Sequence, residues 1–288
     1  MIKSALSLAA LCSFALSSTA TEIRDEDRQG GFAVGAQSYS FNRFSCYEAI
    51  EKNAKAGGKV IEIFPGQQIS REDKGQIGAG MSEDQIKALK EHLAKNHVRA
   101  VNFGVVGIPN NEAEARKIFE FAKKMELYCI TTESADAIDV IEKLVKEYDI
   151  CVAYHNHPRQ DKNPNYKVWD PNYIAELVKG RDPRIGACAD LGHWATSGIK
   201  PIDGLKILKG RVLSSHVKDR SAIGHDTPCI PFGTGVSDIA GCLAELKSQG
   251  FKGNLSIEFE AMWEDNTAEI GQCIGFVRAT GIALSPKP

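Results

Sequence analysis

Several features that would assign this sequence to a broad class of protein are absent. Basic residues are not in excess, since 35 Lys and Arg stand against 37 Asp and Glu, whereas nucleic-acid binders usually carry a basic face. After residue 20 there is no apolar run of the roughly 20 residues that a membrane-spanning helix needs. No two cysteines have the C-x-x-C spacing of a zinc or redox site. We therefore expect neither a nucleic-acid partner nor a membrane span.

The N-terminus has a composition of its own. Lys3 precedes an apolar run that ends at Leu16, and small residues follow before the chain becomes polar. This pattern is typical of a cleaved secretory signal peptide. We therefore expect residues 1–20 to be a signal peptide, residues 21–31 to be an N-terminal extension, and the protein to be exported to the periplasm or secreted.

The cysteines do not form the framework of a small disulfide-bonded protein. Removal of Cys12 with the signal peptide leaves seven, an odd number, in a chain far too long to need such a framework. Cys129, Cys151 and Cys188 lie inside strand-like runs, where a free cysteine behaves as a small buried hydrophobe. We expect these thiols to be free and buried.

From Phe32 onward, short β-branched runs alternate with helical patterns of about 10 to 15 residues, which indicates βαβ units and a parallel sheet. The predicted strands are Val34 to Ser40, Val60 to Phe64, Val98 to Phe103, Tyr128 to Thr132, Ile150 to His155, Ile185 to Asp190, Val212 to Val217 and Asn254 to Glu258. Eight units fit a (β/α)8 TIM barrel of about 250 residues. We therefore predict an α/β fold with one TIM barrel domain over residues 32–288.

Capping residues precede several of the predicted helices. Ser82 and Gln85 have the spacing of a capping box, and Asn111 and Ser134 are candidate N-caps for the next two helices. Asp170 precedes a proline, which favours a helix start. A doubly wound open sheet is the competing architecture, but the first predicted strand is not followed by the glycine-rich turn of a nucleotide site.

Polar residues collect where the predicted strands end, at the face where TIM barrels build their active sites. These residues are Glu62, Glu133, His155, His157, Asp190, His193, His216, Asp219, Glu258 and Glu260. A single histidine or aspartate at a strand end is more often a helix cap or a hydrogen-bonded structural residue. Repetition at four successive strand ends instead indicates one divalent metal ion, because imidazole and carboxylate are ligands for Mn, Co, Zn and Fe.

Six short segments, taken in order and with their strand placement, resemble a known family. They are Ile61-Glu62-Ile63-Phe64, Ala153-Tyr154-His155-Asn156-His157-Pro158, Ala189-Asp190-Leu191-Gly192-His193, Ser215-His216-Val217-Lys218-Asp219-Arg220, Pro231-Phe232-Gly233-Thr234-Gly235 and Ser256-Ile257-Glu258-Phe259-Glu260. Over essentially the whole mature chain the sequence is similar to the sugar phosphate isomerase/epimerase superfamily of xylose isomerase-like TIM barrels.

The resemblance implies a metal set that includes Asp190, His216 and Glu258. It also implies that His193 contacts the substrate and that Lys218 or Asp219 can face it. These roles follow from the family's motifs and not from spacing alone.

The chain departs from the family pattern after the fifth strand. Many epimerases have a glutamate there, whereas this chain has His155-Asn156-His157, and we expect His155 to be the fourth ligand with His157 as the alternative. The metal-bound glutamates of the epimerases also move the proton beside the carbonyl. This chain is therefore a His-Asn-His variant that lacks one of the two glutamates. The two-base epimerisation of the family cannot be assumed for it.

The function that the sequence favours is a metal-dependent sugar isomerase or epimerase acting on a sugar or keto-sugar through an enediolate. Glu258 is the first candidate for the base, and Glu62, His193 or Lys218 can move the proton. A metal-dependent lyase or hydratase is the alternative. In each case we expect a small carbohydrate as the binding partner. The sequence is compatible with either a monomer or a homo-oligomer.

Two further features bear on the substrate. The loop at 233–235 offers backbone N–H groups for a phosphate or for sugar hydroxyls, or is a plain turn. Trp194, Trp263 and Tyr39 are the aromatic residues that a non-catalytic sugar-binding barrel would keep. The apurinic endonucleases share the superfamily, but this sequence lacks their basic face.

Overall fold

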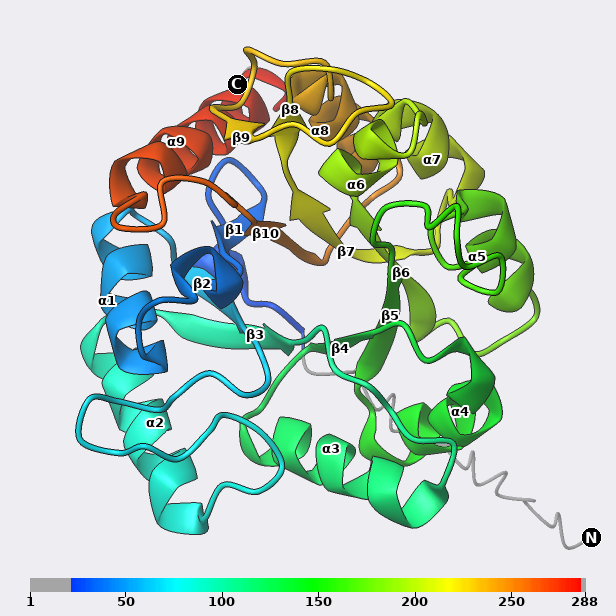
Figure 1. Cartoon of the computed structure of the whole chain (residues 1–288). Coiled ribbons are helices and arrows are strands. Elements are labelled where there is room, and N and C mark those ends of the chain that lie inside the picture. Colours follow the sequence, from blue (N-terminus) through cyan, green and yellow to red (C-terminus); the bar gives the residue numbers. More distant parts are fainter. Residues whose placement is uncertain (1–21, 286–288) are drawn as a thin grey trace, which may run out of the picture.

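A computed structural model describes residues 22–285, so the predicted signal peptide at 1–20 lies outside the described residues. Eight parallel strands form a central ring, and helices surround it (Figure 1). The strands of the ring are β1 Ala33–Ala36, β2 Val60–Ile63, β3 Arg99–Phe103, β4 Cys129–Thr132, β5 Cys151–His155, β6 Ile185–Asp190, β7 Val212–Val217 and β10 Asn254–Ile257. The predicted α/β barrel is confirmed for this part of the chain.

Helices follow the strands and cover the outside of the ring. The α-helices are α1 Cys46–Lys55, α2 Glu83–Lys95, α3 Glu112–Lys124, α4 Ile138–Tyr148, α5 Pro171–Leu177, α6 Leu191–Thr196, α7 Pro201–Ile207, α8 Ile239–Ser248 and α9 Thr267–Ala283. Short 3-10 turns are η1 Asp25–Asp27, η2 Ser38–Phe41 and η3 Ala135–Ala137. Within residues 22–285, no helix is both long enough and apolar enough to cross a membrane.

The ring is closed by its first two strands. Neighbouring strands follow the order β1, β10, β7, β6, β5, β4, β3, β2, and a parallel bridge joins Gln37 after β1 to Glu62 in β2. Because all the strands run in one direction, their carboxyl ends share one face of the barrel. Residues that are far apart in the sequence therefore meet at that face.

The first strand is shorter than the sequence predicted. It ends at Ala36, because the Gln37 side chain accepts a hydrogen bond of 2.6 Å from Tyr39 N and the chain turns into η2. A short antiparallel hairpin, β8 Asp219–Arg220 with β9 Cys229–Ile230, was also not predicted. It lies in the long connection after β7, beside the carboxyl ends of the strands.

Most of the predicted helix starts are confirmed. Ser82 and Gln85 form a capping box, and the side chains of Asn111 and Asp170 each accept a backbone N–H at their helix starts. Ser134 was a wrong prediction, because its Oγ accepts the backbone N–H of Ile108 at 2.9 Å and makes no cap. The seven described cysteines are free and buried, as expected.

Asn53 ties the outer helix α1 to the closure of the ring. Its side chain is fully buried, and its Oδ1 accepts Ala36 N at 2.8 Å. Its Nδ2 donates to the carbonyls of Gly58 and Val60 at 3.3 and 3.2 Å. One side chain thus pairs three backbone groups that water does not reach.

We expect Asn53→Ala to lower the free energy of unfolding by about 3 kcal/mol, because it leaves buried backbone groups without partners. Urea unfolding followed by circular dichroism measures this loss. The control is Asn163→Ala, an exposed asparagine that contacts Gln160. Equal effects of the two substitutions would contradict the role given to Asn53.

Candidate active site

A pocket opens at the carboxyl ends of the strands. Its volume is about 500 Å³. It is lined by Gln37, Tyr39, Phe64, Pro65, Val105, His157, His193, Glu258, Glu260 and Trp263. The lining includes both charged and aromatic side chains, so the pocket suits a ligand with both polar groups and apolar surface.

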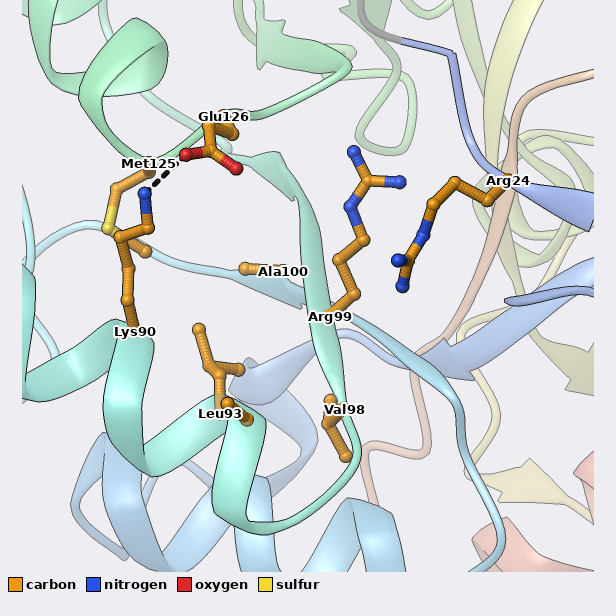
Figure 2. A pocket seen from close by; sticks show the side chains of 9 residues that line it. Arg24, Lys90, Leu93, Val98, Arg99, Ala100, Met125 and Glu126 are labelled. Atoms are coloured by element: carbon orange, nitrogen blue, oxygen red, sulfur yellow. Dashed lines mark hydrogen bonds and ion pairs between the residues drawn. The ribbon is translucent and has the colours of Figure 1, made fainter. Parts of the chain in front are cut away.

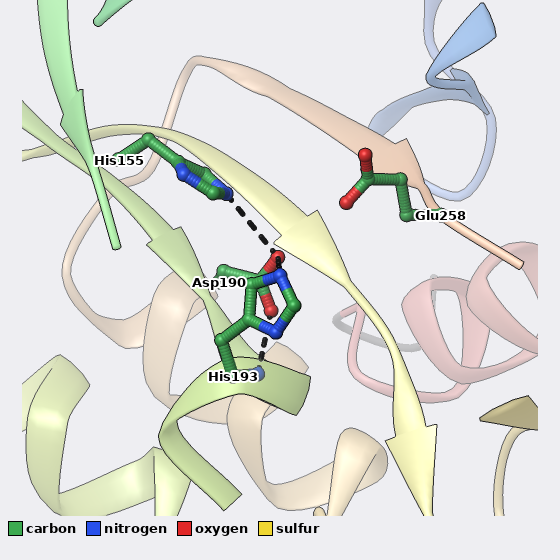
Figure 3. Close-up of side chains that lie close together, drawn as sticks. All are labelled: His155, Asp190, His193 and Glu258. Carbon is green, nitrogen blue, oxygen red and sulfur yellow. Dashed lines mark hydrogen bonds and ion pairs between the residues drawn. The ribbon is translucent and has the colours of Figure 1, made fainter. Parts of the chain in front are cut away.

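Four side chains at the floor of this face could hold one metal ion. His155, Asp190, His193 and Glu258 offer nitrogen and oxygen atoms that all lie within 4.8 Å of one another. Figure 3 shows them converging from β5, from the end of β6 and the start of α6, and from the end of β10. All four residues are buried. Three of them belong to the predicted ligand set, and the fourth is the histidine that was expected to contact the substrate.

Asp190 serves two purposes with its two carboxylate oxygens. Oδ1 accepts the backbone N–H of His193 at 2.8 Å and caps α6. Oδ2 faces the cluster, 3.4 Å from His155 Nε2 and 2.6 Å from Lys218 Nζ. Asp190 therefore caps α6 with one oxygen and offers the other to the candidate cluster.

Lys218 supplies a buried positive charge between the carboxylates. Its side chain is fully buried, and its ammonium group donates to Asp190 Oδ2 and to His193 Nε2, the latter at 2.9 Å. It also forms a very close ion pair with Glu258 and lies 3.4 Å from Glu260 Oε1. Burial would lower the pKa of Lys218, but these carboxylates raise it well above its usual value. Lys218 is therefore charged at neutral pH.

His155 is oriented by a glutamate from the neighbouring strand. Its Nδ1 lies 2.8 Å from Oε1 of Glu133, which directly follows β4. The same oxygen lies 2.5 Å from His157 Nδ1 and accepts the Tyr166 hydroxyl at 3.1 Å. With Nδ1 held in this way, Nε2 of His155 is the atom left to face Asp190.

His216 is oriented by a second glutamate inside the barrel. Its Nε2 lies 3.0 Å from Glu62 Oε2, and that oxygen also accepts the Ser256 hydroxyl at 2.6 Å. Nδ1 of His216 is buried without a hydrogen-bond partner among the described residues. It lies 3.3 Å from Glu258 Oε2 and 3.9 Å from Asp190 Oδ2. A nitrogen that faces two carboxylates, and is ion-paired with one of them, lies where a cation could also bind.

The carboxylates of the cluster are ionised. Burial would raise the pKa of Glu258, but Lys218 and His216 outweigh this effect and hold the pKa well below its usual range. Burial acts on Asp190 in the same way, and the ammonium group of Lys218 outweighs it and holds the pKa well below its usual range. The pKa of His193 is lowered well below its usual value, chiefly by burial. A neutral His193 accepts from Lys218 through Nε2 and keeps a proton on Nδ1.

Several residues singled out in the sequence lie elsewhere than their predicted roles require. Glu62 does not line the pocket but lies beneath His216 within the barrel. Trp194 is 1% exposed and packs in the core, so it is not available to stack on a sugar, whereas Tyr39 and Trp263 both line the pocket. The role of Glu133 was missed, although its position at a strand end was visible in the sequence.

The predicted roles of Asp219 and of the loop at 233–235 are corrected together. Asp219 Oδ2 accepts the backbone N–H groups of Gly233 and Gly235, both at 3.0 Å, and its Oδ1 accepts that of Ser237 at 3.1 Å. The loop's donors are thus satisfied by a protein carboxylate. They are not available to a phosphate, and Asp219 is a loop anchor instead of a substrate contact.

A hollow of about 350 Å³ lies at the opposite end of the barrel, where β3 begins (Figure 2). Its charged groups are already paired: Lys90 with Glu126, and Arg24 and Arg99 with Asp27. The carboxyl ends of the strands do not reach this hollow. The chemistry of the chain therefore belongs to the pocket above the metal-type cluster.

Comparison with known families identifies the family of this chain. Residues 50–280 match the model of the family described as xylose isomerase-like TIM barrels. The chain belongs to this family. No curated protein matches the chain.

Solved structures of other xylose isomerase-like barrels superpose on the chain. An uncharacterised protein from Parabacteroides distasonis is 29% identical, with a TM-score of 0.70 over 86% of this chain and 99% of that one. A D-tagatose 3-epimerase-like protein is 18% identical, with a TM-score of 0.67 over 87% and 98% of the two chains. A family member from Mycobacterium smegmatis, in complex with magnesium, is 13% identical, with a TM-score of 0.67 over 87% and 97%. The last two show a shared fold.

We expect Glu133→Gln to weaken the binding of Mn²⁺ about 10- to 100-fold, because the variant keeps a neutral acceptor but loses the charge that orients His155. Titration of the metal-free protein with Mn²⁺, followed by electron paramagnetic resonance of the free ion, measures this affinity.

The control for this measurement is Glu120→Gln, which removes an exposed carboxylate from the outer helix α3. It should bind Mn²⁺ as the unmodified protein does. If Glu133→Gln also left the affinity unchanged, Glu133 would have no part in orienting a ligand.

Proposed function

We propose that this protein is a divalent-metal-dependent enzyme of the isomerase or epimerase type that acts on a sugar or keto-sugar through an enediolate. The observation that carries the proposal is the position of Glu258. Its carboxylate belongs to the metal-type cluster and also lines the pocket. A group in both places can contact a substrate beside a bound cation.

The residues present fit one divalent ion. His155, Asp190, His216 and Glu258 are the ligands we propose, with His193 as the alternative to His216. A mixed imidazole and carboxylate set suits Mn, Co, Zn or Fe, and a similar barrel has been solved with magnesium. When bound, the ion would supply the positive charge that polarises a carbonyl and its neighbouring hydroxyl.

The side chains around the pocket can carry the proton transfers. Glu258, held ionised, is the base that removes the proton from the carbon beside the carbonyl. The Nδ1–H of neutral His193, a residue that lines the pocket, is the donor for the oxygen on which negative charge develops, and the buried Lys218 positions this histidine through Nε2. Glu62 has no path to the substrate in this arrangement, and we assign it the orientation of His216.

A lyase or hydratase is the alternative, and His157 favours it. This histidine lines the pocket with a side chain that is 49% exposed. Burial would lower its pKa, but the contact with Glu133 raises it. A histidine of raised pKa can protonate a leaving group, and elimination needs that step where epimerisation needs a second base.

The substrate that we propose carries no phosphate group. Asp219 satisfies the N–H groups of Gly233 and Gly235, so this loop has no donors left for a phosphate. The predicted signal peptide leads us to propose an exported protein, and phosphorylated sugars are rare outside the cell. The two arguments are independent of each other.

Incubation with a panel of keto-sugars in deuterated water with Mn²⁺ tests the proposal. We expect deuterium at the carbon beside the carbonyl, because the proton that returns to an enediolate comes from solvent. A chelator should abolish the exchange and Mn²⁺ restore it. Glu258→Gln should slow the exchange by about 100-fold or more, and mass spectrometry and NMR measure it.

The matched variant for this experiment is Glu120→Gln, which should exchange at the rate of the unmodified protein. An unsaturated product, seen by its ultraviolet absorbance, would select the lyase over the isomerase. Absence of exchange and of elimination with every keto-sugar, in protein shown to contain the metal, would refute the proposal and favour a sugar-binding barrel without catalysis.

A further inference from the structure

A second hollow adjoins the pocket and has no role in the chemistry proposed above. Its volume is about 450 Å³, and Tyr39 and Phe64 line both hollows. Its polar lining residues are Asn42, Arg43, Ser45, Glu48, Gln67 and Gln68. The two hollows are therefore neighbours with a common aromatic wall.

The common wall is an ordered group of rings. Tyr39 and Phe64 meet edge to face, with ring centroids 5.4 Å apart and an angle of 77° between the rings. Trp263 also packs edge to face with Tyr39, with ring centroids 6.2 Å apart and an angle of 86° between the rings. Tyr39 is nevertheless 41% exposed. An exposed aromatic residue held in place by two other rings is a suitable surface for the apolar face of a sugar.

Gln67 gives the second hollow an unsatisfied polar group. The residue is 3% exposed, and its Nε2 donates to the carbonyl of Phe44 at 3.1 Å. Its Oε1 is buried and has no hydrogen-bond partner among the described residues. A buried acceptor without a donor is unfavourable, and a hydroxyl group entering the hollow would supply one.

The charges around the second hollow are paired. Arg43 forms an ion pair with Glu264, and Glu48 forms one with Arg71. Glu48 also accepts the Ser45 hydroxyl at 2.7 Å. With its charged groups neutralised and the buried Gln67 Oε1 left without a donor, the hollow suits a neutral ligand rich in hydroxyls better than an anion.

We infer that the two hollows form one carbohydrate site with two subsites, so the substrate is a neutral disaccharide or another glycoside and not a single free sugar. The reacting ring lies above Glu258, and the second ring lies in the hollow lined by Asn42 and Gln67, with Tyr39 and Phe64 between them. The reaction at the first ring rests on the proposed function. The presence of the second subsite does not.

Isothermal titration of the full-length protein tests the inference. The probes are neutral disaccharides, each measured beside its component monosaccharides. We expect at least one disaccharide to bind about tenfold or more tightly than either component, because the second ring adds contacts with the aromatic wall and the amides. Equal affinities, or no binding of any disaccharide, would overturn the inference.

Asn42→Ala and Gln67→Ala should lower the affinity for that disaccharide about tenfold more than the affinity for the monosaccharide. Ile282→Ala, at a side chain 62% exposed on the distant helix α9, should change neither. Because Gln67 is buried, thermal unfolding checks that its variant folds, and the half-buried Asn42 gives a second variant. Equal losses for both ligands would contradict the second subsite.

Binding and exchange separate the two proposals. Tight disaccharide binding without deuterium exchange would retain the two-part site and refute the proposed reaction. Exchange with a monosaccharide, together with no preference for disaccharides, would retain the reaction and refute the second subsite.

Discussion

The buried charges at the carboxyl ends of the strands set the main constraint on this structure. Asp190 and Glu258 are ionised and shielded from water, which is unfavourable unless positive charge lies next to them. Lys218 meets part of that need, because its ammonium group touches both carboxylates. His216 adds a second contact to Glu258, since its Nδ1 lies 3.3 Å from Glu258 Oε2. A site of this kind is suited to stabilising negative charge on a substrate oxygen.

Two carboxylates outside the cluster determine which atoms face it. Glu133, after β4, holds Nδ1 of His155, and Glu62, in β2, holds Nε2 of His216. Each histidine thereby presents its other nitrogen to Asp190 or Glu258. The glutamate that orients each histidine thus comes from a neighbouring or an opposing strand of the ring. These glutamates determine which nitrogen of each ring faces the cluster, although they do not contact the substrate themselves.

The sequence was sufficient for the barrel and for the positions of the strand-end residues, since both follow from a local repeat of apolar strands and capped helices. It was not sufficient for contacts between distant segments. Asp219 accepts the backbone N–H groups of the loop at 233–235, and Ser134 Oγ accepts the backbone N–H of Ile108. Both hydrogen bonds depend on how the loops fold back onto the barrel, which the spacing of residues in the sequence does not predict. The central position of Lys218 and the orienting role of Glu133 were missed for the same reason: both depend on side-chain contacts between strands.

The two halves of the pocket are built from different kinds of structure. The charged floor lies on strand ends, where the ladder of the barrel fixes each side chain, as a reaction centre requires. The aromatic wall and the second hollow instead use the segments after β1 and β2 and the loop that carries Trp263. Loops can change in sequence without disturbing the ring. We therefore propose that residues such as Tyr39 and Gln67 select the sugar, and that Glu258 and its neighbours determine the class of reaction.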